Sequence, residues 1–177
     1  GFNWYKKTGA TSNDLNAVAY DGTTYVIVGD KTTNTGGPTI QHSQNTNSWT
    51  LASNTNSLGS GQNLYDVIYN DDYDAFYAVG DAGLILKSTD SGVTWTVLES
   101  GESEVAIRSI SWHEGVMVAG VDRGHILISD DGGDTWETNT ITNTVTTDRN
   151  QDAADLLLKN KKLLAAQGLF NYLNNGG

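Results

Sequence analysis

The chain has 177 residues, with 21 acidic and 10 basic side chains, no cysteine, one proline and a net charge of −11. This acidic surface argues against binding to nucleic acids or anionic membranes, and no apolar run approaches the length of a membrane span. The absence of cysteine excludes disulfides, thiolate metal sites and a cysteine nucleophile.

Three stretches of the sequence repeat the same order of short apolar runs. Each contains three β-rich runs and a later tryptophan, with turn-forming residues between them: 15–20, 25–30, 39–43 and Trp49; 64–69, 76–81, 84–88 and Trp95; 107–112, 116–120, 125–129 and Trp136. The tryptophans at the matching place of each unit, Trp4, Trp49, Trp95 and Trp136, are 45, 46 and 41 residues apart. Four short strands in about 45 residues are typical of one β-propeller blade.

The repeat predicts an all-β fold, a single propeller domain of four four-stranded blade units over residues 1–177. The approximate blades are 11–52, 53–98, 99–139, and 140–177 together with 1–10. Residues 153–172 fit the strand scheme, although their Ala, Leu and Lys content also suits an amphipathic helix. Phe2–Lys7 is expected to complete the last blade as its outer strand, which would leave no free sheet edge.

Two segments, 88–95 and 129–136, share the pattern Ser-x-Asp-x-Gly-x-Thr-Trp. This pattern resembles the Asp-box, or bacterial neuraminidase repeat, of β-propellers, and is similar to repeats of sialidase-like and photosystem II stability and assembly factor-like propellers. A shorter copy at 43–49 has Asn45 in the Asp place, and a copy split across the termini has Asn174 and Gly176 in the Asp and Gly places.

The resemblance implies a turn between the third and fourth strands, on the face away from the usual ligand site. A short carboxylate can accept hydrogen bonds from nearby backbone N–H groups, glycine permits the turn, and tryptophan packs it onto the blade. We therefore predict structural roles for these positions: Ser88, Asp90, Gly92, Trp95, Ser129, Asp131, Gly133 and Trp136.

Candidate ligand-binding residues occupy two matched positions of the repeat. The second position of the first strand holds a different polar residue in each unit: Asn16, Tyr65, Arg108 and Asp155. An aspartate follows the second strand in three units: Asp30, Asp81 and Asp122. These aspartates either hold a cation or sugar hydroxyls, or make ordinary turn contacts, and the second interpretation is favoured.

An enzyme is not expected. Sialidases bind the substrate carboxylate with three arginines and use a Tyr–Glu nucleophile pair with an Asp acid, but Arg108, Arg123 and Arg149 lie at unrelated places in the repeat. No histidine shows metal-ligand spacing and no glycine-rich segment forms a phosphate loop. We predict no cofactor and no metal site; a two-carboxylate glycosidase is the enzyme class that stays open.

The sequence favours a binding or structural module of a larger assembly, such as a phage virion or an adhesin. Its expected partners are other protein subunits, a cell-surface glycan or a cell-surface protein, and a homo-oligomer also fits. Alternatives are a sugar-binding propeller lectin and a relative of the photosystem II assembly factors. The expected location is extracellular or in a virion, with the thylakoid lumen or periplasm as the alternative.

Overall fold

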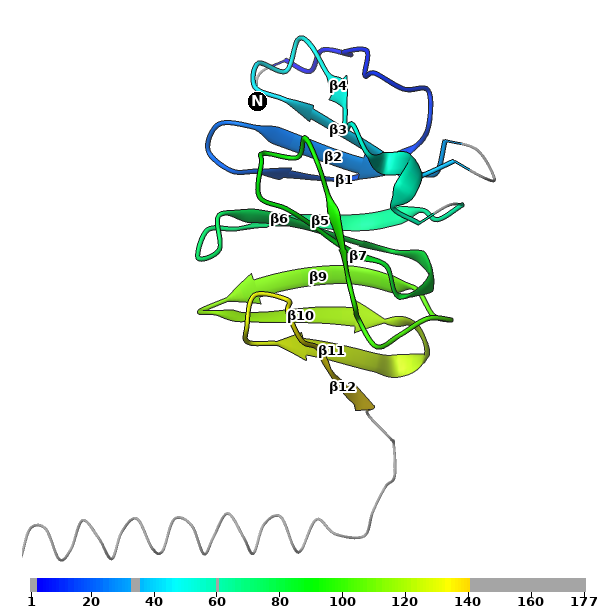
Figure 1. Ribbon diagram of the computed structural model, residues 1–177. Helices are drawn as coiled ribbons and strands as arrows, with labels where there is room; N and C mark the ends of the chain where they lie inside the picture. The colour runs from blue at the N-terminus through cyan, green and yellow to red at the C-terminus, as the bar shows by residue number, and fades with distance from the viewer. Residues whose placement is uncertain (1–2, 33–35, 60, 141–177) are drawn as a thin grey trace, which may run out of the picture. The chain divides into compact units, whose positions relative to one another are not determined.

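Short β-rich runs separated by tight turns form three four-stranded antiparallel sheets, each a simple meander (Figure 1). The computed structural model describes residues 3–32, 36–59 and 61–140. Blade one contains β1 (Leu15–Tyr20), β2 (Tyr25–Gly29), β3 (Thr39–Ser43) and β4 (Thr50–Leu51). Blade two contains β5 (Leu64–Asn70), β6 (Ala75–Gly80), β7 (Ile85–Ser88) and β8 (Thr96–Leu98). Blade three contains β9 (Ile107–His113), β10 (Val116–Val121), β11 (His125–Ser129) and β12 (Glu137–Thr140).

Three 3-10 turns join these strands: η1 (Thr55–Ser57), η2 (Asp81–Gly83) and η3 (Asp122–Gly124). The last two begin with the aspartate that follows the second strand of their blade. None of the helical segments within the described ranges is long and apolar enough to cross a membrane.

The core consists of two layers, each between consecutive blades. Val26, Val28 and Ile40 of blade one pack against blade two, and the opposite face of blade two packs against blade three. Strand β6 is buried at every residue because it contributes to both layers. Strand β10 instead alternates, burying Met117 and Ala119 against blade two.

The prediction of an all-β propeller fold is confirmed, with three blade units in the described residues. The register corrects one detail of the repeat. Phe76 lies opposite Ser88, and Met117 lies opposite Ser129, so Met117 is the counterpart of Phe76 and Val121 the counterpart of Gly80. The fourth unit, the choice between strand and helix for 153–172, and the closed ring lie outside the described residues and stay predictions.

The outer strand expected at Phe2–Lys7 is not formed within the described residues, and the last blade that it would complete lies outside them, so this pairing stays a prediction. Residues 3–14 contain no strand, and the Trp4 side chain is 96% exposed whereas Trp95 is 2% exposed. A strand needs a partner to satisfy its N–H and C=O groups, and no described strand pairs with this segment. Its contacts are made through side chains instead: Lys7 Nζ donates to Asn47, and the Ala10 N–H donates to the Gln41 side chain.

Candidate functional site

A β-bulge occurs at the second position of the first strand in each of the three described blades. Asn16, Tyr65 and Arg108 each lie at a shift in the pairing register between the first and second strands. A bulge redirects the side chain of the unpaired residue. The same backbone irregularity therefore presents a different side chain from each blade.

Each bulged residue donates a hydrogen bond to the aspartate that follows the second strand of its own blade. The Asn16 amide donates to Asp30 over 3.0 Å, and the Tyr65 hydroxyl donates to Asp81 over 2.5 Å. The three aspartates are held alike, since their backbone N–H groups donate to the carbonyls of Asp14, Asn63 and Ala106 just before the first strands.

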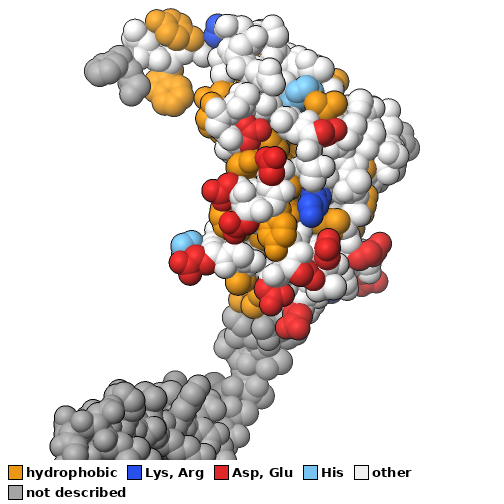
Figure 2. All heavy atoms as spheres, turned by 60° about the vertical axis from the view of Figure 1, so that its left-hand side comes forward, with side chains coloured by type: hydrophobic (Ala, Val, Ile, Leu, Met, Phe, Trp, Pro, Cys, Tyr) orange, Lys and Arg blue, Asp and Glu red, His pale blue; other side chains and the backbone are white. Residues whose placement is uncertain are grey.

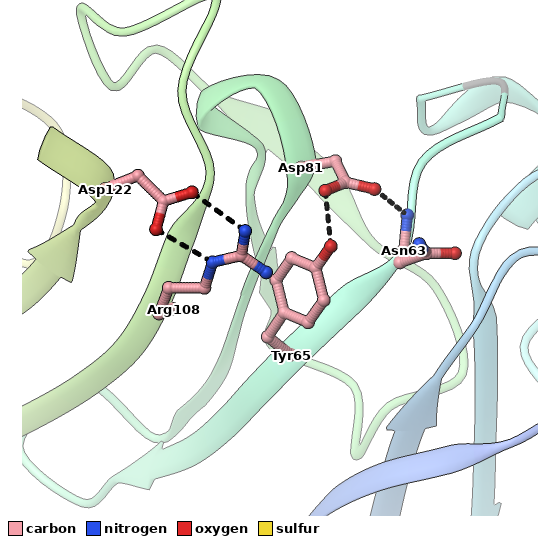
Figure 3. Close-up of polar contacts among 5 residues, drawn as sticks. All are labelled: Asn63, Tyr65, Asp81, Arg108 and Asp122. Atoms are coloured by element: carbon pink, nitrogen blue, oxygen red, sulfur yellow. Dashed lines mark hydrogen bonds and ion pairs between the residues drawn. The ribbon is translucent and has the colours of Figure 1, made fainter.

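Arg108 forms the strongest of these pairs and links it to the next blade. Its Nε and Nη2 donate to the two Asp122 oxygens over 3.0 and 2.8 Å, in a bidentate geometry (Figure 3). The guanidinium also lies over the Tyr65 ring, 4.3 Å from its centroid. On the other side, the Asn16 amide donates to the Leu64 carbonyl of blade two over 2.8 Å. We call the six residues Asn16, Asp30, Tyr65, Asp81, Arg108 and Asp122 the polar row.

The electrostatics of the polar row keep its strongest pair ionised. The hydrogen bonds to Asp122 raise the pKa of Arg108, and the same contact lowers the pKa of Asp122. Burial, followed by the hydrogen bond to Asp81, raises the pKa of Tyr65. Arg108 and Asp122 are about half exposed, so the row presents fixed charges and hydroxyl and amide groups to solvent.

The structure brings together six of the seven predicted ligand-binding residues, as pairs within blades. Asp155 lies outside the described residues. Residues 3–32, 36–59 and 61–140 contain no group of three or more His, Asp or Glu side chains arranged to hold a metal ion. The cation considered for Asp30, Asp81 and Asp122 has no such group to bind it.

The two Ser-x-Asp-x-Gly-x-Thr-Trp turns are closed by their own side chains. In blade two, Asp90 accepts hydrogen bonds from the Thr94 N–H and hydroxyl and from the Ser88 hydroxyl, while Ser88 accepts from the Gly92 N–H. The Trp95 indole donates to the Gly92 carbonyl over 3.0 Å. Blade three repeats the bonds of the aspartate and serine with Asp131, Ser129, Gly133 and Thr135, and Trp136 is partly buried there.

Ionisation supports the same turns. In Asp131, the hydrogen bonds from Thr135 and Ser129 outweigh burial and lower the pKa to about 2. Burial of Asp90 opposes ionisation, but hydrogen bonds from Thr94 and Ser88 lower its pKa overall. Asn45 of the shorter copy closes its turn without a charge, accepting from the N–H groups of Asn47 and Ser48.

Sequence reasoning missed residues that connect one blade to the next. Asn63 donates its N–H to Asp81 (Figure 3). Its side-chain oxygen accepts from the Lys31 N–H of blade one. Asp66 accepts from the Ile110 N–H of blade three over 2.9 Å. Both occur in or beside a first strand, but their partners lie in another blade, so the repeat alone carries no signal for them.

Residues 2–156 match the sequence family described as the DUF6242 beta propeller domain. The chain belongs to this family. No curated protein matches its sequence.

Solved propellers resemble this DUF6242 domain in fold. YCF48 bound to D1 peptide is 17% identical with a TM-score of 0.59, over 73% of this chain and 41% of that one. The WD40 β-propeller domain of Doa1 is 16% identical with a TM-score of 0.52, over 75% and 42%. The GH43 BlXynB protein from Bacillus licheniformis is 13% identical with a TM-score of 0.52, over 73% and 32%. The chain therefore spans less than half the length of these propellers.

Proposed function

We propose that this domain is a non-catalytic binding module that contacts a polypeptide partner through the polar row. The observation that carries the proposal is a backbone arrangement that stays the same from blade to blade while the side chain it presents changes. The bulge and the aspartate recur in every described blade, while the residue they present changes from Asn16 to Tyr65 to Arg108. Such variation suits one asymmetric partner better than a repeated ligand.

The hydrogen bonds and ion pair made by the three aspartates of the polar row argue against a catalytic role for them. A general acid needs a raised pKa, but the pKa of Asp122 is lowered by Arg108. Asp30 and Asp81 each accept a hydrogen bond from a neighbouring side chain. The likeness to a GH43 protein is one of fold, so it carries no catalytic residue to this chain.

The exposed chemistry of the polar row suits a peptide. Arg108 and Tyr65 combine a cationic group with an aromatic ring, the residue types that dominate many binding surfaces. Arg108 can donate through its remaining N–H groups to a carbonyl or carboxylate of a partner. YCF48 has been solved with a bound peptide, which supports a polypeptide partner for a domain of similar fold.

The Ser-x-Asp-x-Gly-x-Thr-Trp turns are Asp-boxes with a structural role in this proposal, because their polar side chains are engaged within the turn. Membership of a larger extracellular assembly, such as a virion or an adhesin, is the context we propose for the domain. Acidic charge and richness in Asn, Thr and Gly support that context through composition alone.

The test is affinity capture from the native source with the full chain, followed by measurement of the affinity for the recovered partner. Arg108→Ala and Tyr65→Ala should each weaken binding roughly tenfold or more. Asp130→Ala, a change to an exposed side chain in the turn between β11 and β12, should leave it unchanged. A partner bound equally by all three variants, or glycosidase turnover abolished by changing one carboxylate, would contradict the proposal.

A further inference from the structure

A polar cleft of about 360 Å³ lies between blades one and two. It lies at the ends of β2 and β3 that are opposite to the polar row, between the β3–β4 turn of blade one and residues 91–93 of blade two. Its lining is dominated by hydroxyl, amide and imidazole groups, among them Thr24, His42, Gln44, Ser48, Thr50 and Ser91.

The matching interface between blades two and three shows what normally fills this space. Val26 lies opposite His42 in blade one, and Tyr77 lies opposite Lys87 at the same place in blade two. Ser91 of the blade-two turn corresponds to Gly132 of the blade-three turn. These matched positions allow a direct comparison of the two interfaces.

Large side chains occupy the space between blades two and three. The Tyr77 hydroxyl and Lys87 Nζ both donate to the Gly132 carbonyl, over 2.7 and 3.2 Å. The Tyr73 ring lies against Gly132 so closely that an added Cβ would be 2.5 Å from it. Between blades one and two, the shorter Val26 and His42 side chains leave the cleft open.

Two features of the residues that line the cleft reduce the stability of the protein. The Thr24 hydroxyl is buried, in a residue that is 1% exposed, and has no hydrogen-bond partner. Ser91 adopts a left-handed backbone conformation, φ 58°, where blade three uses glycine. Burying an unpaired hydroxyl and holding a serine in this conformation both reduce stability. A ligand that hydrogen-bonds to the Thr24 hydroxyl would remove the first of these costs, and the Ser91 hydroxyl at the cleft is a second group that it could contact.

We propose that this cleft binds a neutral sugar residue. The lining offers hydrogen-bond donors and acceptors and contains no carboxylate, lysine or arginine. The β5–β6 and β9–β10 turns, at the same ends of the sheets as Thr24, carry Asp71, Asp72, Asp74 and Glu114. Figure 2 shows acidic side chains gathered on the face that it draws, and such charges repel anionic ligands. The volume falls at the lower end of small-molecule sites and suits one or two sugar rings. This site is separate from the polar row and goes beyond the proposed function.

The test is a titration of the ¹⁵N-labelled full chain with methyl glycosides of glucose, galactose, mannose, xylose and N-acetylglucosamine, followed by NMR. At least one glycoside should shift the amide signals of residues 24, 42–45 and 91–93 with saturable, millimolar affinity. An absence of shifts with all five probes, or shifts centred on the polar row, would overturn the proposal.

Variants separate binding from stability. Thr24→Val removes the unpaired hydroxyl at constant size, so it should weaken glycoside binding about fivefold without lowering the melting temperature. The double variant Val26→Tyr/His42→Lys should fill the cleft and abolish binding, whereas the control Asp130→Ala, at an exposed side chain outside the cleft, should bind as the wild type does. Unchanged binding in both cleft variants would contradict the assignment.

Discussion

The interface between blades one and two and the interface between blades two and three have the same backbone arrangement, but different side chains fill them. In both, a Ser-x-Asp-x-Gly-x-Thr-Trp turn of the later blade rests on the second and third strands of the earlier one. Gly92 approaches Val26 and His42, and Gly133 approaches Tyr77. Between blades two and three, aromatic and lysine side chains reach the turn, and between blades one and two they are replaced by shorter residues.

This difference separates the positions that stabilise the fold from those whose side chains can vary and take part in binding. The turn-closing hydrogen bonds recur almost unchanged in blades two and three, so they belong to the frame. The residues at the second position of the first strand and at the Val26 and Tyr77 places vary. Variation on a constant frame is where we expect recognition to reside.

The largest effect is expected from emptying the filled interface. Tyr77 is fully buried, and its hydroxyl is bonded across the interface. Tyr77→Ala should lower the free energy of unfolding by about 4 kcal/mol, through a cavity and a lost hydrogen bond. Val26→Ala at the matching position should cost about 2 kcal/mol, because it removes fewer buried atoms. Urea denaturation of both variants measures the difference, and equal losses would contradict the comparison.

A smaller effect is expected from opening a turn. Asp90→Ala removes the acceptor of the Thr94 N–H and hydroxyl, so it should lower the free energy of unfolding by about 1 kcal/mol. The affinity for a partner at the polar row should not change. Asp130→Ala, which alters an exposed neighbour of the matching turn, serves as the control. A loss of partner binding in Asp90→Ala without a loss of stability would show that the turn itself is a binding site.

The charge of the blade-three turn should be visible in the pH dependence of stability. The pKa of Asp131 falls from its ordinary value of 3.8 to about 2 on folding. Its contribution is therefore present above about pH 4 and is lost as the pH falls toward 2. Asp131→Asn copies the Asn45 turn of blade one. This variant should have a lower free energy of unfolding than the wild type at neutral pH and should match it near pH 2. Denaturation curves at several pH values would contradict this if the difference stayed constant.

The smallest effect should have the opposite sign. Ser91→Gly relieves a left-handed backbone conformation that blade three assigns to Gly132, so it should raise the free energy of unfolding by about 0.5 kcal/mol. Thermal denaturation measures the gain. Gly132→Ser is the reciprocal change and should be destabilising, because the new side chain would meet the Tyr73 ring. A stabilised Gly132→Ser variant would show that the two turns are not equivalent.

Much of the fold could be predicted from the repeat, because a blade is built from local hairpins whose apolar runs and turns are contiguous in sequence. The pairing of Arg108 with Asp122 lies within one blade, and aligned repeats placed both residues at matched positions. The contact of Asp66 with blade three, and the cleft beside Thr24, depend on how separate blades pack. The pairing expected for Phe2–Lys7 likewise depends on a partner strand that its own sequence does not specify, and that partner lies outside the described residues.

The most direct test of the central comparison is a crystal structure of the double variant Val26→Tyr/His42→Lys. If the two interfaces share one frame, the new tyrosine hydroxyl and lysine amine will both donate to the Ser91 carbonyl, as Tyr77 and Lys87 donate to Gly132. The cleft will then be filled with the backbone unchanged. Side chains turned to solvent, with the cleft still open or the blades displaced, would contradict the account.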